Sequence, residues 1–532
     1  MKSIKSYLSV FVCSLFLIAS LLSPHLGQAN TSDNIIYNSK TGDAPKCIVF
    51  FNSTDETVGE ETKKQLAKED SSHAQNNPST DNNIDTHDAH ASPAGWSVIP
   101  FAILLLMIAT GPLFYAHFWH HHYPKIALIL GFSVAIYYIF GLHDIHHPVH
   151  ALAEYASFIC LLAALFVASG GILIKVDKPG RPLVNVMLLI FGAVISNVIG
   201  TTGASMLLIR PFIRLNENRI KPFHIVFFIF MVSNVGGSLT PIGDPPLFLG
   251  FLKGIDFFWT MENLWMQWMF GIVLLSIIFF FVDSRSIKKE MQNDDKTYSG
   301  KITVKGLKNI TWLVITIGAV FIDPNVMDWV PYIPYHGDKI SYMRELIMLA
   351  TTYYAFKFSD EECLKGNEFD FEPIKEVAYI FIGIFGTMMP ALQLIGDFAK
   401  SPEGREMITD NLLYWSTGAL SGVLDNAPTY LNFLSAAMAK NDLDLGSKAD
   451  VLAFTADPVT MISLSAISVA AVFFGAMTYI GNAPNFMVKS IAEQSGVKMP
   501  AFAAYVVKYS LPILLPVLVL VWLVFYLLPS ML

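Results

Sequence analysis

Apolar residues dominate the chain from Trp96 onward and form runs long enough to cross a hydrocarbon core of about 30 Å. Short polar segments separate these runs, which is a pattern typical of membrane-spanning helices. We predict ten crossings, near residues 97–117, 126–142, 152–174, 222–251, 264–283, 306–322, 343–357, 374–397, 459–488 and 503–529. Two more runs, 183–213 and 411–440, are interrupted midway by small and polar residues, and we predict each to be a re-entrant hairpin. The pattern therefore predicts an all-α polytopic membrane protein.

The first 95 residues differ in kind from the rest. Residues 1–29 combine a basic start, a short apolar run and a small-residue cleavage site, which predicts a signal peptide. An uncleaved first helix is the alternative, but the apolar run is short for a crossing. Residues 30–95 are polar and too poor in apolar side chains to offset their ordering entropy, so we predict a disordered extracytoplasmic tail.

Composition and charge narrow the class of protein. Hydrophobic residues make up 53% of the chain and charged residues 15%, and the formal net charge is −8. This excludes a basic nucleic-acid binder, and membrane lipid is the expected surrounding. The four cysteines have no metal-ligand spacing, and we expect no cofactor beyond transported or coupling ions.

The distribution of Lys and Arg supports the predicted topology. With the tail outside, the inner segments hold 21 of the 28 basic residues that follow residue 95. This is the bias that the positive-inside rule requires, in an inner (plasma) membrane. The bias depends on 183–213 being a hairpin, because a full crossing would place either Lys175–Arg181 or Arg214–Lys221 outside.

The two halves of the chain repeat each other weakly but in order. A crossing that opens with Glu154 or Glu376 is followed in each half by a hairpin and then by a broken crossing. The broken crossings share the pattern Thr-x-Ile-Gly-[Asp/Asn]-x-Pro-x-Phe, beginning at Thr240 and Thr478. We therefore predict repeats at 96–283 and 306–532, joined by a cytoplasmic linker at 284–305. Five crossings per repeat is an odd number, so the second repeat is expected to be inverted, as in many secondary transporters.

Polar side chains at the hairpin tips and helix breaks are the candidate site. Their oxygens suit a hard cation such as sodium, and free helix ends suit ions of either sign. The candidates for cation or substrate binding are Asn197, Thr201, Thr202, Asn234, Thr240, Asp244, Asp425, Asn426, Thr429, Thr478 and Asn482. For the Asn and Thr residues the alternative is satisfaction of freed backbone groups.

Two aspartates stand out among these candidates. Asp425 lies at a hairpin tip among apolar neighbours, and we predict it to be the shared sodium and proton site, with Asn426 and Asn197 as further sodium ligands. Asp244 precedes Pro245 and is expected either to cap the following helix or to bind the ion directly.

Other ionisable groups are weaker candidates. Glu154 and Glu376 each lie near the start of a crossing and are proton-coupling candidates, although a salt bridge is the alternative. Eight histidines gather in predicted loops, where a pH sensor or simply a wet interface is expected. They are His117, His120, His121, His122, His143, His146, His147 and His150.

The paired tips and breaks resemble those of the ion transporter superfamily, which includes NhaD-type sodium/proton antiporters, arsenite permeases and citrate and dicarboxylate carriers. The resemblance covers most of residues 97–529 and implies a transport domain that moves against a scaffold within a homodimer. The NhaD pattern favours Asp-Asn at the first tip, where this chain has Ser196-Asn197, and the chain has an Asp-Asn pair only at the second tip, Asp425-Asn426. Neither tip carries the Ser-Asn-Thr triplet of dicarboxylate carriers. The resemblance favours sodium/proton antiport, and cation-coupled uptake of citrate, a dicarboxylate or another anion is the runner-up.

Two other classes of protein, an intramembrane enzyme and a channel, fit the sequence less well than a transporter does. An intramembrane enzyme requires a nucleophile–base pair or a zinc motif, and the chain has no His-Glu-x-x-His motif. A channel requires a continuous pore and does not explain an inverted repeat. The expected function is therefore secondary transport without enzymatic activity, with a small inorganic cation or a small carboxylate as the substrate.

Overall fold

The computed structural model describes residues 92–176, 179–287, 301–324, 327, 329–335 and 338–529. These residues belong to one compact unit, His90–Leu532. The predicted signal peptide and nearly all of the predicted tail lie outside the described residues.

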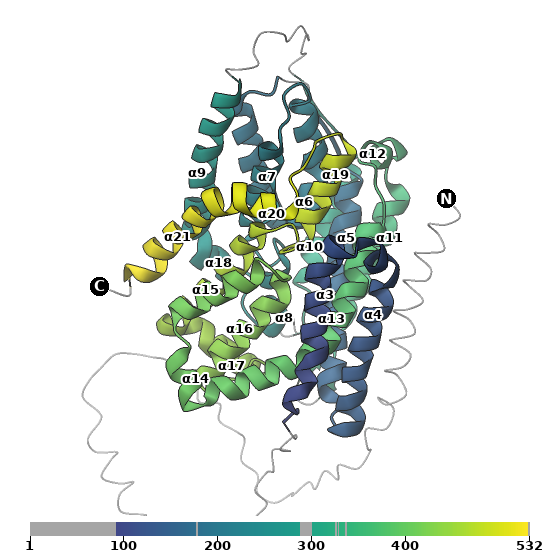
Figure 1. The fold of residues 1–532 in the computed structure, drawn as a ribbon. Coiled ribbons are helices and arrows are strands. Elements are labelled where there is room, and N and C mark those ends of the chain that lie inside the picture. Colours follow the sequence, from purple (N-terminus) through teal and green to yellow (C-terminus); the bar gives the residue numbers. More distant parts are fainter. Residues whose placement is uncertain are drawn as a thin grey trace, which may run out of the picture. The chain divides into compact units, whose positions relative to one another are not determined.

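Helices make up most of this unit (Figure 1). The first half contains α3 (Ile99–Phe114), α4 (Ala116–Ile136), α5 (His146–Gly170), α6 (Pro182–Leu215), α7 (Pro222–Met231), α8 (Pro245–Lys253) and α9 (Trp259–Ile287). The second half contains α10 (Lys308–Val320), α11 (Met343–Phe358), α12 (Glu361–Gly366), α13 (Glu372–Lys400), α14 (Pro402–Met407), α15 (Asp410–Ser421), α16 (Asn426–Lys440), α17 (Lys448–Ala456), α18 (Pro458–Phe474), α19 (Ala483–Gln494), α20 (Phe502–Tyr505) and α21 (Leu515–Trp522). Short 3₁₀ or π segments are η2 (Gly95–Val98), η3 (Tyr137–Gly141), η4 (Val235–Gly237), η5 (Gly475–Met477), η6 (Val506–Leu514) and η7 (Leu523–Leu527).

Seven helices among the described residues are long and apolar enough to cross a membrane. Six of them coincide with predicted crossings, and the seventh is α6, the predicted first hairpin. The other predicted crossings contain shorter helices, such as α7 and α10, or carry charge, as α11 does with Arg344 and Glu345. The chain is thus a multi-pass membrane protein.

Helix α6 folds back on itself at Gly200, although its length alone suits a single crossing. Gly200 has φ 76° and ψ 155°, which a side chain would disfavour, and it separates two helical limbs. Near the ends of these limbs, the amides of Asn185 and Asn216 exchange two hydrogen bonds of 2.9 Å. A straight helix would hold these residues about 46 Å apart. α6 is therefore a hairpin whose two ends lie together.

Helices α15 and α16 form the second hairpin. Its ends also meet, because the Lys440 ammonium donates to the carbonyl of Ile408 at 2.5 Å and Arg405 pairs with Asp442. The tip is the turn before Asn426, where α16 begins.

Helix α9 shows that the two hairpins open at opposite ends of the unit. Near its start, the Trp259 indole donates to the carbonyl of Thr455 in α17, the helix that follows the second hairpin. Near its end, Asp283 accepts from Asn185 at the open end of the first hairpin. About 36 Å of helix separates Trp259 from Asp283. The two tips consequently point toward each other, and Thr201 and Asn426 at these tips both donate to Asp244.

The two broken crossings have the same local structure. In each, a helix is followed by a 3₁₀ turn, a loop and a second helix: α7, η4 and α8 in the first half, and α18, η5 and α19 in the second. The Thr240 hydroxyl accepts from the Gly243 N–H at 3.1 Å, and the Thr478 hydroxyl accepts from the Gly481 N–H at the same distance. The shared sequence pattern therefore produces a shared loop.

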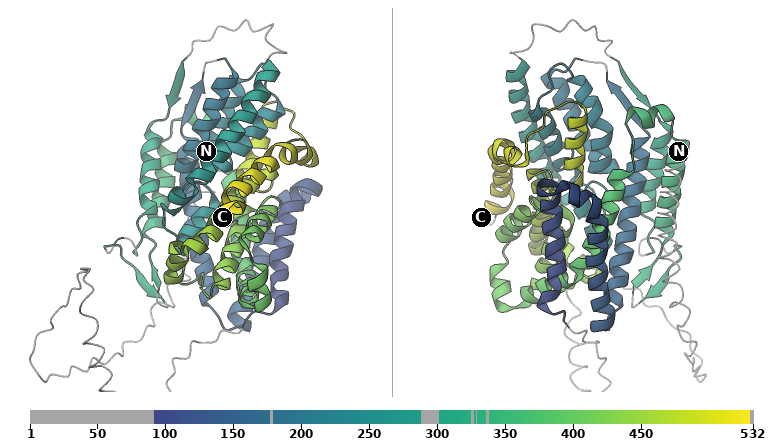
Figure 2. Two further views of the ribbon diagram at one scale, coloured as in Figure 1. Left: turned by 90° about the vertical axis from the view of Figure 1, so that its left-hand side faces the viewer. Right: turned by 45° about the vertical axis from the view of Figure 1, so that its right-hand side comes forward.

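The presence of strands differs from the sequence prediction. The fold is not entirely helical, because β1 (Leu173–Val176) pairs antiparallel with β2 (Ile302–Lys305), and β3 (Ile333–Tyr335) pairs with β4 (Asp338–Ile340) (Figure 2). The β1–β2 pair ties the segment between the halves to the end of α5 through backbone hydrogen bonds that hydropathy does not reveal.

Most of the histidines predicted in loops are helical, so that prediction is wrong for them. His117 and His120–His122 lie in α4, and His146, His147 and His150 lie in α5, while His143 stays in a loop. The helices begin earlier than their apolar runs, since aromatic rings stack along the helix axis, as His121 does on His117.

Candidate functional site

Asp244 lies where both hairpin tips and both broken crossings meet. Its carboxylate is buried, with 1% of the residue exposed. It accepts from the Thr201 hydroxyl at 2.7 Å, from the Asn426 amide at 2.6 Å and from the Asn482 amide at 2.9 Å. These donors come from the first hairpin, the second hairpin and the second broken crossing. One carboxylate thus joins the two halves of the chain.

The two aspartates differ in which of them caps a helix. Asp244 occupies the N-cap position of α8, but its side chain makes no capping hydrogen bond. Asp425 does cap a helix, because its carboxylate accepts from the Ala427 N–H of α16 at 3.0 Å. The capping expectation for Asp244 is wrong because three side-chain donors compete for its oxygens.

A network of amides surrounds Asp244. The Asn482 amide also donates to the Asn234 oxygen at 3.2 Å, and the Asn234 amide donates to the Asn485 oxygen at 2.7 Å. Asn485 in turn donates to the carbonyls of Gly475 and Thr478. Asn485 is absent from the predicted site, although its place in the second motif, one residue before Phe486, is polar where the first motif has Leu247.

Four predicted site residues support the backbone of the breaks. Asn197 donates to the Gly236 carbonyl at 2.7 Å and accepts from the Leu239 N–H at 2.8 Å. The Thr240 and Thr429 hydroxyls donate to the carbonyls of Asn197 and Asp425. Together with Thr478, these side chains satisfy groups freed by the breaks, which is the alternative role for Asn and Thr.

One oxygen at this junction has no partner. The Oδ1 atom of Asn426 is buried without a hydrogen bond in the described part of the chain, although its amide nitrogen donates to Asp244. A buried carbonyl oxygen without a donor is costly unless something else satisfies it. Because it lies beside a carboxylate, it fits a ligand of a hard cation.

A cavity of about 360 Å³ leads to this junction. Its floor includes Thr202, Asp425 and Asn482, and the α6 side of its wall continues through Met206 to Arg210. The cavity lining contains five carboxylates and a single guanidinium, that of Arg210. These carboxylates belong to Asp425, Glu368, Asp370, Glu372 and Glu376. The cavity is therefore acidic.

The two glutamates proposed for proton coupling lie in different places. Glu376 lines the cavity. Glu154 is outside it and forms an ion pair with Lys253 at 2.6 Å. The structure therefore brings only Glu376 into the path that leads to the junction.

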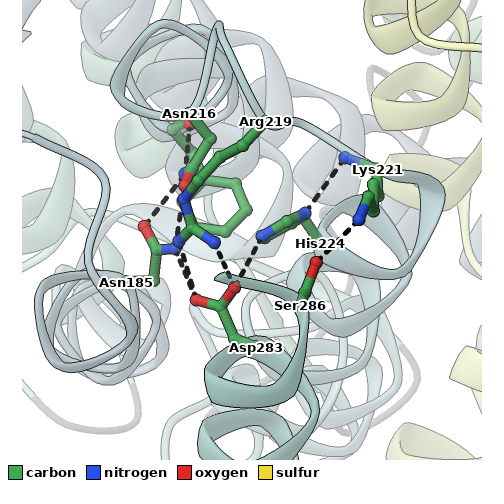
Figure 3. Close-up of polar contacts among 8 residues, drawn as sticks. Asn185, Asn216, Arg219, Lys221, His224, Asp283 and Ser286 are labelled. Atoms are coloured by element: carbon green, nitrogen blue, oxygen red, sulfur yellow. Dashed lines mark hydrogen bonds and ion pairs between the residues drawn. The ribbon is translucent and has the colours of Figure 1, made fainter. Parts of the chain in front are cut away.

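A second buried polar cluster lies at the open end of the first hairpin (Figure 3). Asp283, which is fully buried, accepts from both terminal nitrogens of Arg219 at 2.5 and 2.8 Å, from His224 at 3.1 Å and from Asn185 at 2.9 Å. The cluster fixes the hairpin to α7 and α9. The sequence did not predict this cluster, although an Asp at the end of an apolar run is a signal of a buried partner.

Comparison with protein families agrees with this architecture. Residues 90–526 match a family model described as "putative citrate transport". The chain belongs to this citrate-transport family. The match covers both hairpins and both broken crossings, so the Asp244 junction lies within the matched residues. Among curated proteins, none matches this sequence closely enough to count as a relative.

The match to this family confirms the resemblance to the ion transporter superfamily, which includes citrate carriers. The protein is thus a multi-pass member of a transporter family.

Proposed function

We propose that this member of the citrate-transport family exchanges sodium for protons by alternating access. The observation that carries the proposal is the charge of the cavity lining, which holds five acidic residues and one arginine. Arg210 pairs with Glu368 and Lys375 pairs with Glu372, which leaves Asp370, Glu376 and Asp425 as the acidic residues of the lining outside these two ion pairs. Clefts lined by one sign of charge concentrate counter-ions. Such a lining attracts sodium and repels a free tricarboxylate.

The floor of the cavity supplies a chemistry for exchange. Asp425 reaches the cavity, and the next residue, Asn426, carries the unpartnered oxygen beside Asp244. Sodium binds the Asp425 carboxylate in its charged form, whereas a proton neutralises it. The two ligands therefore compete for one group, which is sufficient for antiport if the empty, charged site crosses rarely.

The orientation is part of the proposal. The Lys and Arg bias supports a cytoplasmic location for the open end of the first hairpin, with Arg210 and the cavity mouth. The hairpins that open at opposite ends and the matching loops support an inverted repeat. The N-terminal tail is then extracytoplasmic, in the inner membrane, and we expect a homodimer.

Citrate uptake is the second candidate, and three observations favour it. The family is described by citrate transport. The N-termini of α8, α16, α19 and the second limb of α6 converge on the junction, and helix N-termini favour anions. In addition, the Nη1 atom of Arg210 is buried without a partner in the described residues.

Flux measurements in proteoliposomes separate the two candidates. Purified protein is reconstituted with a trapped pH-sensitive dye and challenged with sodium, lithium, potassium or citrate gradients. Antiport predicts proton movement on addition of sodium or lithium without citrate. Citrate accumulation that depends on a cation gradient, with no proton movement in its absence, would favour the second candidate.

A further inference from the structure

The end of the described unit opposite the cavity mouth is closed by two layers of contacts that α5 makes with α8 and α13. The first layer is aromatic. Phe158 of α5 stacks on Phe381 with ring centroids 4.7 Å apart and contacts Phe248 of α8 at 6.3 Å. Phe158 and Phe381 also line the cavity, so the cavity ends on this layer.

The second layer is the ion pair between Glu154 and Lys253. Glu154 lies one helical turn before Phe158 on α5, and Lys253 is the last residue of α8, beyond Phe248. Their side chains are 12% and 16% exposed and lie 2.6 Å apart, and His150 lies 3.7 Å from the same carboxylate oxygen. The pair therefore lies behind the aromatic layer, farther from the cavity.

Helix α8 connects this ion pair to the junction. It begins directly after Asp244 and ends at Lys253, a rod of nine residues. If Asp244 and α8 move together relative to α5, Lys253 at the far end of α8 moves with them and separates from Glu154 on α5. Breaking a largely buried pair leaves uncompensated charges, unless water reaches both of them.

We propose that Glu154 and Lys253 form a latch that holds the site closed at this end while the cavity is open at the Arg210 end. Opening of the Lys253 end separates the pair, exposes both charges to water and presents the Glu154 carboxylate to an incoming cation. The latch goes beyond the proposed antiport, because it concerns access to the site whichever substrate crosses.

Sided labelling of a cysteine at the site tests the latch. Thr202→Cys, which places a thiol on the cavity floor, is introduced with the four native cysteines replaced by serine or alanine. Labelling rates with a membrane-impermeant thiol reagent are then measured separately from each face of the membrane. In the parent protein we expect labelling mainly from the face at the Arg210 end.

Neutralising either charge of the Glu154–Lys253 pair should change the ratio of the labelling rates from the two faces. Lys253→Met and Glu154→Gln should each raise labelling from the opposite face relative to the Arg210 face, on the order of tenfold. The charge exchange Glu154→Lys with Lys253→Glu should restore the parent ratio. Lys489→Met is the matched control, because Lys489 pairs with Glu493 within one helix, and it should leave the ratio unchanged.

An unchanged ratio in both Lys253→Met and Glu154→Gln would overturn the latch. Failure of the double exchange to restore the ratio, in protein that is folded and inserted, would also overturn it. The labelling needs no sodium flux, so a failed antiport assay leaves this test intact.

Discussion

Asn426 donates a hydrogen bond of 2.6 Å to Asp244, a residue 182 positions away in the other half of the chain. The bond joins the tip of the second hairpin to the break of the first crossing, and Thr201 and Asn482 complete the same junction. The Asp244 carboxylate therefore links the hairpin tips and helix breaks of the two halves, together with the bond from Asn234 to Asn485.

Asp244→Asn should destabilise the protein more than a surface substitution does. An amide offers one acceptor oxygen where three donors converge, so it leaves buried donors unpaired, each costing about 1–3 kcal/mol. We expect a clear fall in melting temperature in detergent together with loss of transport. Thr429→Ala is the comparison, because its hydroxyl donates only to a backbone carbonyl. Equal melting temperatures for Asp244→Asn and wild type would contradict the junction.

Asp283→Asn should weaken the attachment of the first hairpin. The substitution leaves the Arg219 guanidinium without its bidentate partner in a buried place, and breaking such a pair typically costs about 3–5 kcal/mol. We expect early proteolysis or hydrogen exchange confined to the ends of α6. Arg405→Gln, which removes an exposed ion pair at the end of the second hairpin, should have little effect on stability. Similar losses in the two variants would argue against a special role for Asp283.

Glycine-to-alanine changes in the two matching loops should differ in severity. A Cβ atom at Gly243 would lie 2.1 Å from the Gly237 carbonyl oxygen, whereas one at Gly481 would lie 2.6 Å from that of Gly475. Both contacts are with backbone, which cannot easily move away. We expect Gly243→Ala to cost more stability than Gly481→Ala, with each in the range of about 1–3 kcal/mol that overpacking causes. Thermal unfolding measures the order, and the reverse order would show that the first loop yields more readily.

The hairpin of α6 can be tested by labelling from either side of the membrane. A single cysteine at Lys175 precedes α6 and one at Arg214 lies in its last turn, and the ends of α6 are joined by Asn185 and Asn216. Both cysteines should react from the same face, which the basic residues indicate to be cytoplasmic. Reaction of the two from opposite faces would contradict the hairpin.

Six of the ten predicted crossings coincide with long apolar helices, and the two interrupted runs form hairpins, because apolar length reflects the hydrocarbon core directly. The other four predicted crossings contain shorter helices. The sequence also located the polar tips and breaks, since Asn, Thr and Asp are conspicuous in such surroundings. The different roles of Asp244 and Asp425 could not be predicted, because each stands directly before the start of a helix, where an aspartate commonly acts as the N-cap. Only the three-dimensional meeting of Thr201, Asn426 and Asn482 decides which carboxylate is engaged.

The charge cluster at Asp283 was not predicted, and for Glu154 a salt bridge was the alternative but Lys253 was not identified as its partner, for a related reason. Each depends on a partner distant in the chain: Asn185 and Arg219 for Asp283, and Glu154 for Lys253. Hydropathy and spacing carry no information about which charged residues meet. The short β1–β2 pair escaped detection because four-residue strands leave little pattern.

The most direct test of the account is sodium-driven proton movement with Asp425→Asn protein in proteoliposomes. The neutral side chain keeps an oxygen that can cap α16 but loses the titratable charge, so insertion and melting temperature should stay close to wild type. Wild-type protein should move protons on addition of sodium, and the sodium concentration for half-maximal exchange should rise as the pH falls, because protons compete for the same carboxylate. Asp425→Asn should reduce this exchange to the background of empty liposomes. Exchange by Asp425→Asn protein at near wild-type rate would contradict the role of Asp425 as the shared sodium and proton site.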